Sequence, residues 1–271
     1  RGPQEIGAAE SSEHSSRIVG ATRRVVFAWA LLAAALAASG TAGLFLSGVW
    51  PRARPSDLRP PAETRPLQLS FSHTAGGDVG APAISPDGTR VAYGARGADG
   101  MPLLWVRNLA SGEARALPGT EDASLLFWSP DSRDLGFFAG NALKRVPAEG
   151  GPVQVVTKSG SGFGGAWAPD GTIVFNANDF RLFRVSAAPG SAATPLTKLQ
   201  SADWSHYWPS FLPDGRRFLF TAKLWTGAAE SSAQGIYLGS LDSPEISHLL
   251  PDLSSAVYAP PGYLVFVRGG T

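Results

Sequence analysis

Apolar and polar residues alternate in short runs along residues 67–271, which is the pattern of half-buried β-strands. Five of these runs carry a pair of apolar residues two positions apart, just after a polar turn. The pairs are Val91 and Tyr93, Leu135 and Phe137, Ile173 and Phe175, Phe218 and Phe220, and Leu264 and Phe266. Since residues two apart in a strand share one face, each pair predicts a strand that enters a core.

The turn before each pair is a repeated motif, first seen as Ile84-Ser85-Pro86-Asp87-Gly88. Proline presets the backbone for the second position of a β-turn, aspartate can bond its own backbone, and glycine closes the turn. The copies lie 39 to 47 residues apart. The turn residues that we assign are Pro86, Asp87, Gly88, Pro130, Asp131, Pro169, Asp170, Gly171, Pro213, Asp214, Gly215, Pro260 and Gly262. We interpret the aspartates as structural rather than as cation ligands.

Each unit continues past its hairpin with two further apolar runs. The expected third strands are Leu104–Leu109, Leu143–Val146, Leu182–Val185 and Ile236–Leu238, and the fourth strands are Arg115–Leu117, Val153–Val156, Thr194–Leu196 and Ile246–Leu250. Four strands per unit at this period are typical of a β-propeller blade. The sequence therefore predicts an all-β fold, a β-propeller over residues 67–271, with Leu67–Phe71 as a strand that helps close the ring. The fifth unit has only two strands, so we expect at least one more blade beyond Thr271.

Residues 25–50 contain no charged side chain. As a helix they would extend about 37 Å, against a bilayer core of roughly 30 Å. A cleaved signal peptide is the alternative, but the apolar run continues well past the small residues Ala35-Leu36-Ala37. We expect a single transmembrane α-helix, preceded by a polar juxtamembrane linker at 1–24 and followed by a proline- and arginine-rich stalk at 51–66.

Arginines flank both ends of this apolar segment, so charge does not decide its orientation. Small residues recur at every fourth position, at Ala35, Ser39, Gly43 and Ser47. Such a face lets two membrane helices pack closely, which makes a homodimer one possible state.

The amino-acid composition excludes several kinds of partner and site. The net charge is +1 and charged residues make up 17% of the chain, so there is no general attraction for nucleic acid and we expect no such partner. The chain has no cysteine, which excludes disulfides and cysteine-ligated zinc, and its four histidines are widely separated. We expect no metal site and no cofactor within these residues.

The repeats resemble the WD40-like propeller repeats of the TolB type. They are more specifically similar to the C-terminal half of bacterial transmembrane serine/threonine protein kinases. The stretches that carry this likeness are Phe127–Arg133, Gly136–Phe138, Leu143–Val146, Ser205–Phe220 and Tyr258–Leu264. The resemblance implies a cytoplasmic kinase domain that uses ATP and Mg²⁺, one span of the bacterial inner membrane, and an extracytoplasmic propeller that binds a protein or peptide.

The kinase domain itself is absent from this sequence, which contains no Val-Ala-Ile-Lys, His-Arg-Asp or Asp-Phe-Gly element. No catalytic residue is therefore assigned. A related group joins a winged-helix DNA-binding domain to a similar propeller, and a free-standing anchored scaffold like TolB is a third alternative. The residues before Arg1 would discriminate the three.

Three features bear on whether the chain has a nucleotide-binding or catalytic site: a glycine-rich segment, the nucleophile motif of hydrolases, and one histidine. Gly160–Gly165 matches the glycine spacing of nucleotide-binding loops, but it precedes a predicted strand instead of opening a helix, so we interpret it as a loop that enters a blade. There is no Gly-x-Ser-x-Gly nucleophile elbow. His206 lies in an aromatic cluster, and we expect it to form hydrogen bonds within its blade.

Overall fold

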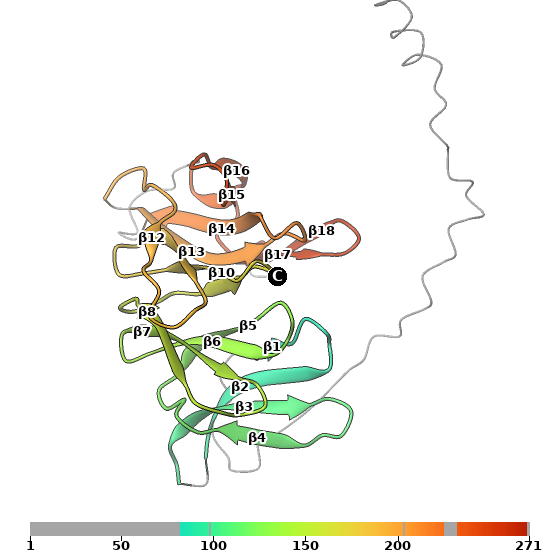
Figure 1. Cartoon of the computed structure of the whole chain (residues 1–271). Coiled ribbons are helices and arrows are strands. Elements are labelled where there is room, and N and C mark those ends of the chain that lie inside the picture. Colours follow the sequence, from blue (N-terminus) through green and yellow to red (C-terminus); the bar gives the residue numbers. More distant parts are fainter. Residues whose placement is uncertain (1–81, 98, 203, 225–231, 270–271) are drawn as a thin grey trace, which may run out of the picture. The chain divides into compact units, whose positions relative to one another are not determined.

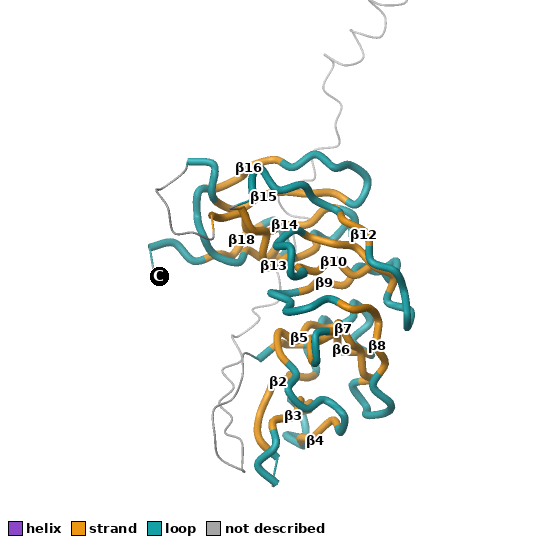
Figure 2. The backbone as a smooth tube through the Cα atoms, turned by 90° about the vertical axis from the view of Figure 1, so that its left-hand side faces the viewer, coloured by secondary structure: helices purple, strands orange, loops and turns teal. Residues whose placement is uncertain are grey.

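The computed structural model describes residues 82–97, 99–202, 204–224 and 232–269 (Figure 1). They belong to one compact unit, residues 70–271. Strands and loops account for all of these residues (Figure 2), which confirms the predicted all-β class. No helix that could cross a lipid bilayer is found among them. The predicted linker, transmembrane helix, stalk and closing strand at residues 1–71 lie outside the described residues.

In the part of the chain that the structure describes, four sheets have four antiparallel strands each, hydrogen-bonded in the order of the sequence, and a fifth has two. The first contains β1 (Ala83–Ile84), β2 (Arg90–Arg96), β3 (Pro102–Asn108) and β4 (Ala114–Leu117). The second contains β5 (Ser124–Trp128), β6 (Asp134–Ala139), β7 (Ala142–Pro147) and β8 (Gln154–Lys158). The third contains β9 (Gly165–Trp167), β10 (Thr172–Asn176), β11 (Leu182–Ser186) and β12 (Thr194–Pro195). The fourth contains β13 (Trp204–Phe211), β14 (Arg217–Leu224), β15 (Gly235–Ser240) and β16 (Ser247–Leu250), and the fifth β17 (Ala256–Ala259) and β18 (Tyr263–Phe266).

The predicted third and fourth strands are confirmed, with ends that coincide or differ by at most two residues. The sheets also follow one another in space, because the first strand of each sheet contacts the first strand of the next (Figure 1). Four-stranded blades whose first strands line a common axis are the arrangement of a propeller.

The second strand of each complete sheet is more buried than its alternation predicts. Phe137 and its neighbour Phe138 are both buried, although they point to opposite faces of β6. Phe137 packs toward the first sheet in a cluster with Leu104, and Phe138 packs toward the third sheet in a cluster with Phe175. A blade has a neighbour on each side, so both faces of its middle strands are buried. The apolar core therefore lies between the sheets.

Candidate functional site: a cleft between the repeat turns

Each complete repeat turn is held by its own serine or aspartate. The Ser85 hydroxyl donates to Oδ1 of Asp87 at 2.5 Å, and the backbone N–H of Thr89 donates to the same oxygen at 2.9 Å. The second turn repeats the contact from Ser129 to Asp131 at 2.7 Å. Asp170 and Asp214 likewise accept from the backbone two residues on, at 2.9 Å each. In each of these turns the aspartate thus accepts hydrogen bonds from its own turn, as its assignment to the turn expects.

The hydrogen bonds of two of these turns favour the ionised form of their carboxylates, those of Asp87 and Asp214. The Ser85 hydroxyl, with help from Thr89, lowers the pKa of Asp87 to about 2. The backbone N–H groups of Arg217 and Arg216 lower the pKa of Asp214 to about 2. A carboxylate that accepts several hydrogen bonds is stabilised in its charged form. Among the described residues, no group of acidic and histidine side chains is placed to share a metal ion.

The turn prolines meet at one cleft of about 460 Å³. Four of the assigned turn residues line it, namely Pro86, Pro130, Pro169 and Pro213. The other assigned turn residues, including Pro260 and Gly262 of the fifth turn, do not. Aromatic side chains from the ends of the first strands complete the lining: Phe127 and Trp128 from β5, Trp167 from β9 and Phe211 from β13. The cleft is therefore mainly apolar, with aromatic and proline rings as its walls.

Contacts between neighbouring turns hold this cleft in shape. The backbone N–H of Asp87 donates to the Ser132 hydroxyl at 3.1 Å, which joins the first turn to the second. The indole N–H of Trp128 donates to the backbone oxygen of Ala83 at 2.9 Å, which joins β5 to β1. Residues on different strands are thus linked directly at the cleft, and such preorganisation reduces the entropy lost on binding.

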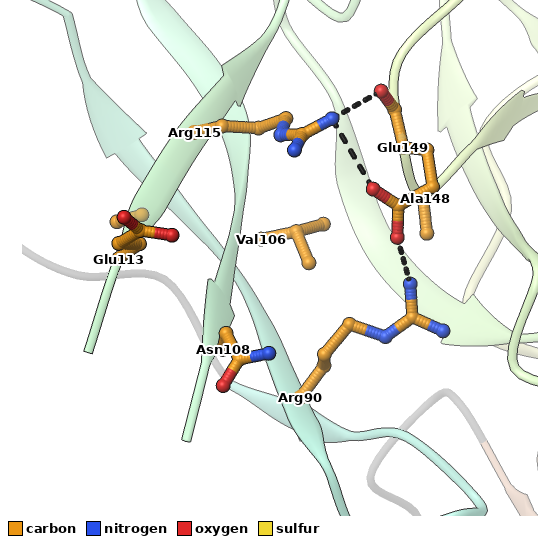
Figure 3. A pocket seen from close by; sticks show the side chains of 8 residues that line it. Arg90, Val106, Asn108, Glu113, Arg115, Ala148 and Glu149 are labelled. Carbon is orange, nitrogen blue, oxygen red and sulfur yellow. Dashed lines mark hydrogen bonds and ion pairs between the residues drawn. The ribbon is translucent and has the colours of Figure 1, made fainter. Parts of the chain in front are cut away.

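A second cavity, of about 400 Å³, lies between the first two sheets (Figure 3). Arg90 and Arg115 point from the first sheet toward Glu149, which follows β7 (Figure 3). Arg90 Nη1 lies 2.7 Å from Glu149 Oε1, and Arg115 Nη1 lies 3.3 Å from Oε2. Both guanidinium groups are already paired with this one carboxylate, so the cavity is a junction between sheets rather than a free anion site.

The glycines of the Gly160–Gly165 segment are explained by packing. A Cβ atom on Gly162 would lie 2.2 Å from the Phe138 ring, and one on Gly165 would lie 2.4 Å from the Phe127 ring. The segment leads into β9, which confirms its interpretation as a loop that enters a blade. Gly162 and Gly165 are required because two phenylalanine rings of the preceding sheet occupy the space of a side chain.

His206 is fully buried, and burial lowers its pKa to about 4. Its Nδ1 lies 2.8 Å from the hydroxyl oxygen of Thr197, which follows β12 of the third sheet. The expected hydrogen bond exists, but it joins two sheets and does not stay within one blade as predicted. The reason is that β13 lies against the end of the third sheet, where Thr197 is the nearest polar partner.

Several solved structures are similar to this chain in fold. TolB from Acinetobacter baumannii matches with a TM-score of 0.55 and 15% identity, over 68% of this chain and 47% of that one. A TolB-like protein from Agrobacterium tumefaciens matches with a TM-score of 0.53 and 21% identity, over 69% of each chain. The Cps50 (Swd1) propeller domain of Myceliophteria thermophila matches with a TM-score of 0.51 and 14% identity, over 66% of this chain and 58% of that one.

The chain thus spans less than half of the A. baumannii TolB chain. No protein-family model and no curated protein matches this sequence. At identities of this size a structural match establishes fold and not activity. Together with the four-stranded sheets and their common first-strand axis, these matches show that the described residues have the fold of a TolB-type β-propeller.

Proposed function

We propose that this chain is the membrane-anchored, extracytoplasmic propeller of a receptor-type serine/threonine protein kinase of the bacterial inner membrane, and that it binds a protein or peptide partner. The likeness of stretches such as Ser205–Phe220 to the outer half of such kinases supports the kinase assignment. The uncharged segment at 25–50 supports the membrane anchor. ATP and Mg²⁺ would act in the kinase domain, upstream of Arg1.

The observation that carries the binding role is the meeting of four repeat prolines at one apolar cleft. Apolar, aromatic walls with few polar groups are typical of ligand pockets, and a volume of 460 Å³ is within their usual range of about 300–1,000 Å³. Extended peptides commonly dock into aromatic-lined grooves. A short apolar segment of a partner protein is the ligand that this surface fits best.

Binding could reach the kinase domains by changing how two chains associate. A ligand that binds better to one association state shifts the population toward that state. The small-residue face at Ala35, Ser39, Gly43 and Ser47 offers a way for two membrane helices to pair. Partner binding outside would then alter the pairing of kinase domains inside, with phosphoryl transfer as the output.

The gene upstream of Arg1 tests the kinase assignment. Reading about 300 codons in frame covers a domain of the usual size, which is up to roughly 250 residues. A glycine-rich loop, a lysine strand and a His-Arg-Asp loop are expected. A helix-turn-helix domain would identify a membrane-bound transcriptional regulator instead, and a start codon next to Arg1 would identify an anchored scaffold. Either result overturns the kinase assignment.

The cleft is tested in the full-length protein by autophosphorylation. Ser210 lines the cleft, and Ser210→Arg places a long side chain where the partner would lie. Ser201→Arg, at an exposed site outside the cleft lining, is the matched control. We expect Ser210→Arg to change kinase activity in the same direction as deletion of residues 67–271, with no effect of Ser201→Arg. Unchanged activity in the deletion variant would contradict a sensing role.

A further inference from the structure

Three sheets have an irregular backbone at the same repeat position, within the first strand in two of them and directly before it in the third. Leu125, Gly164 and Trp208 have φ angles of 51°, 118° and 52°, in the left-handed region. Each stands three residues before the aromatic residue of its turn motif. The register shifts between Ser124 and Phe127 in β5, and between Tyr207 and Ser210 in β13, which marks a β-bulge at this position.

This backbone conformation suits glycine, as in the third sheet, but not tryptophan or leucine. A bulky residue in the left-handed region is a genuine outlier, and strain of this kind collects at functional sites. Bulges likewise reorient a side chain next to a binding surface. Trp208 is thus held in a costly conformation at a strand that lines the propeller axis.

Around Trp208 lies a cluster of aromatic rings, toward the end of the strands away from the repeat turns. The ring centroids of Tyr207 and Trp208 are 5.6 Å apart, and Phe163 meets Tyr207 edge to face at 5.4 Å. Phe180 lies 6.3 Å from Phe163. Phe163 stays 37% exposed and Trp208 is half-buried, so the cluster presents ring surface to solvent.

One cation completes this cluster. The ammonium nitrogen of Lys223, on β14, lies 4.8 Å from the Tyr207 ring centroid and 5.4 Å from that of Trp208. Among the described residues, no carboxylate lies within ion-pair distance of Lys223. Ring faces attract a cation but leave its net charge unbalanced. The surface therefore combines exposed aromatic area with a positive charge that an anionic ligand would complement.

We propose that the Phe163, Phe180, Tyr207, Trp208 and Lys223 cluster is a second binding site, for a peptide segment that carries a carboxylate beside an aromatic side chain. The aromatic side chain stacks on Trp208 and Phe163, and the carboxylate pairs with Lys223. This site lies on other residues than the proline-lined cleft and requires neither the kinase assignment nor that cleft.

Two matched dipeptides test the site on the full 271-residue chain, kept in mild detergent because of its apolar segment. The probes are N-acetyl-phenylalanyl-glutamate amide and N-acetyl-phenylalanyl-glutamine amide, which have nearly the same size and differ in the charge of the second side chain. The eight tryptophans are labelled with 5-fluorotryptophan and followed by ¹⁹F NMR. The Trp208 signal is assigned by its loss in Trp208→Gly, a change that the left-handed backbone accepts because Gly164 occupies the same repeat position.

The glutamate probe is expected to shift the Trp208 signal saturably, with about five-fold tighter binding than the glutamine probe, as befits one exposed ion pair. Lys223→Gln is expected to remove that difference, while Lys158→Gln, on β8, retains it. Equal binding of both probes by the unaltered chain, no shift of Trp208, or discrimination that survives Lys223→Gln would each overturn the proposal. So would a stronger response to glucuronate than to the acidic dipeptide, because the occupant would then be a saccharide.

Discussion

The guanidinium group of Arg145 donates a hydrogen bond to the backbone oxygen of Ala187, 3.2 Å away in the next sheet. Arg184, at the matching position of the third sheet, makes the same bond to the backbone oxygen of Leu241 at 3.2 Å. Each arginine lies on the third strand of its sheet, and each acceptor directly follows the third strand of the next. The repeated contact joins consecutive sheets at their outer part.

Removal of this arginine contact is expected to destabilise the fold. Arg145 also donates from Nε to Gln154 Oε1 at 3.0 Å, so Arg145→Met leaves two acceptors without their charged donor. A hydrogen bond to a charged group contributes roughly 1.5–3 kcal/mol, and we expect a loss of about 2 kcal/mol in the free energy of unfolding. Urea unfolding measures it. Arg133→Met is the control, because that side chain is 83% exposed and its ion pair is expected to contribute little. Equal losses in the two variants would contradict the role of Arg145.

Gly162→Ala is expected to destabilise the fold by about 1–3 kcal/mol, the usual cost of overpacking a core. The new methyl group would meet the buried ring of Phe138. Gly262→Ala is the matched control, since nothing lies within 4 Å of the Cβ position there. Thermal unfolding of both variants checks the difference. A neutral Gly162→Ala would show that the loop moves aside and that packing does not explain this glycine.

Leu125→Gly is expected to stabilise the fold, against the usual effect of adding a glycine. Leu125 is 44% exposed and has a φ of 51°, a conformation that costs an L-residue roughly 1–2 kcal/mol relative to glycine. Glycine loses more backbone entropy on folding, which offsets part of this effect, so we expect the free energy of unfolding to rise by about 0.5–1 kcal/mol. Leu253→Gly is the control, because Leu253 is 50% exposed and its φ is negative. Urea midpoints should rise in the first variant and fall in the second.

His206 is expected to make stability fall as the solution is acidified. Its pKa is about 4 in the folded protein, against about 6.5 for a histidine exposed to water, so between these pH values the unfolded chain binds the extra proton. The loss begins as pH falls below about 6.5 and reaches about 2 kcal/mol at about pH 5. The groups that face the ring, Thr197, Gln200 and Phe220, carry no charge.

Urea unfolding at pH 7 and pH 5 measures this effect in the unaltered chain and in His206→Gln. The variant should lose much less stability over that interval, because glutamine does not titrate. His14, His73 and His248 are common to both proteins, so their effects cancel. Identical pH dependence in the two proteins would show that His206 is not the responsible group.

Much of the fold was predictable because its signals are local. A proline, an aspartate and a glycine in sequence determine a turn through their own backbone preferences, and apolar pairs after the turn mark a strand. The four copies before residue 220 therefore predicted the hairpins and their order. The cleft was not predictable in the same way, because the turn signal of Pro86 does not state that its ring faces those of Pro130 and Pro169.

The sequence by itself thus determined the repeat, the strands and the role of aspartates such as Asp87, since each depends on residues within a few positions. Only the tertiary structure determined which residues of neighbouring sheets contact one another. Arg145 donates a hydrogen bond to a residue 42 positions away, and His206 forms a hydrogen bond with Thr197 of the neighbouring sheet. Trp208 adopts a left-handed φ that its own side chain disfavours. The physical reason is that these contacts arise when blades pack, and the packing energy outweighs the local preference of any one residue.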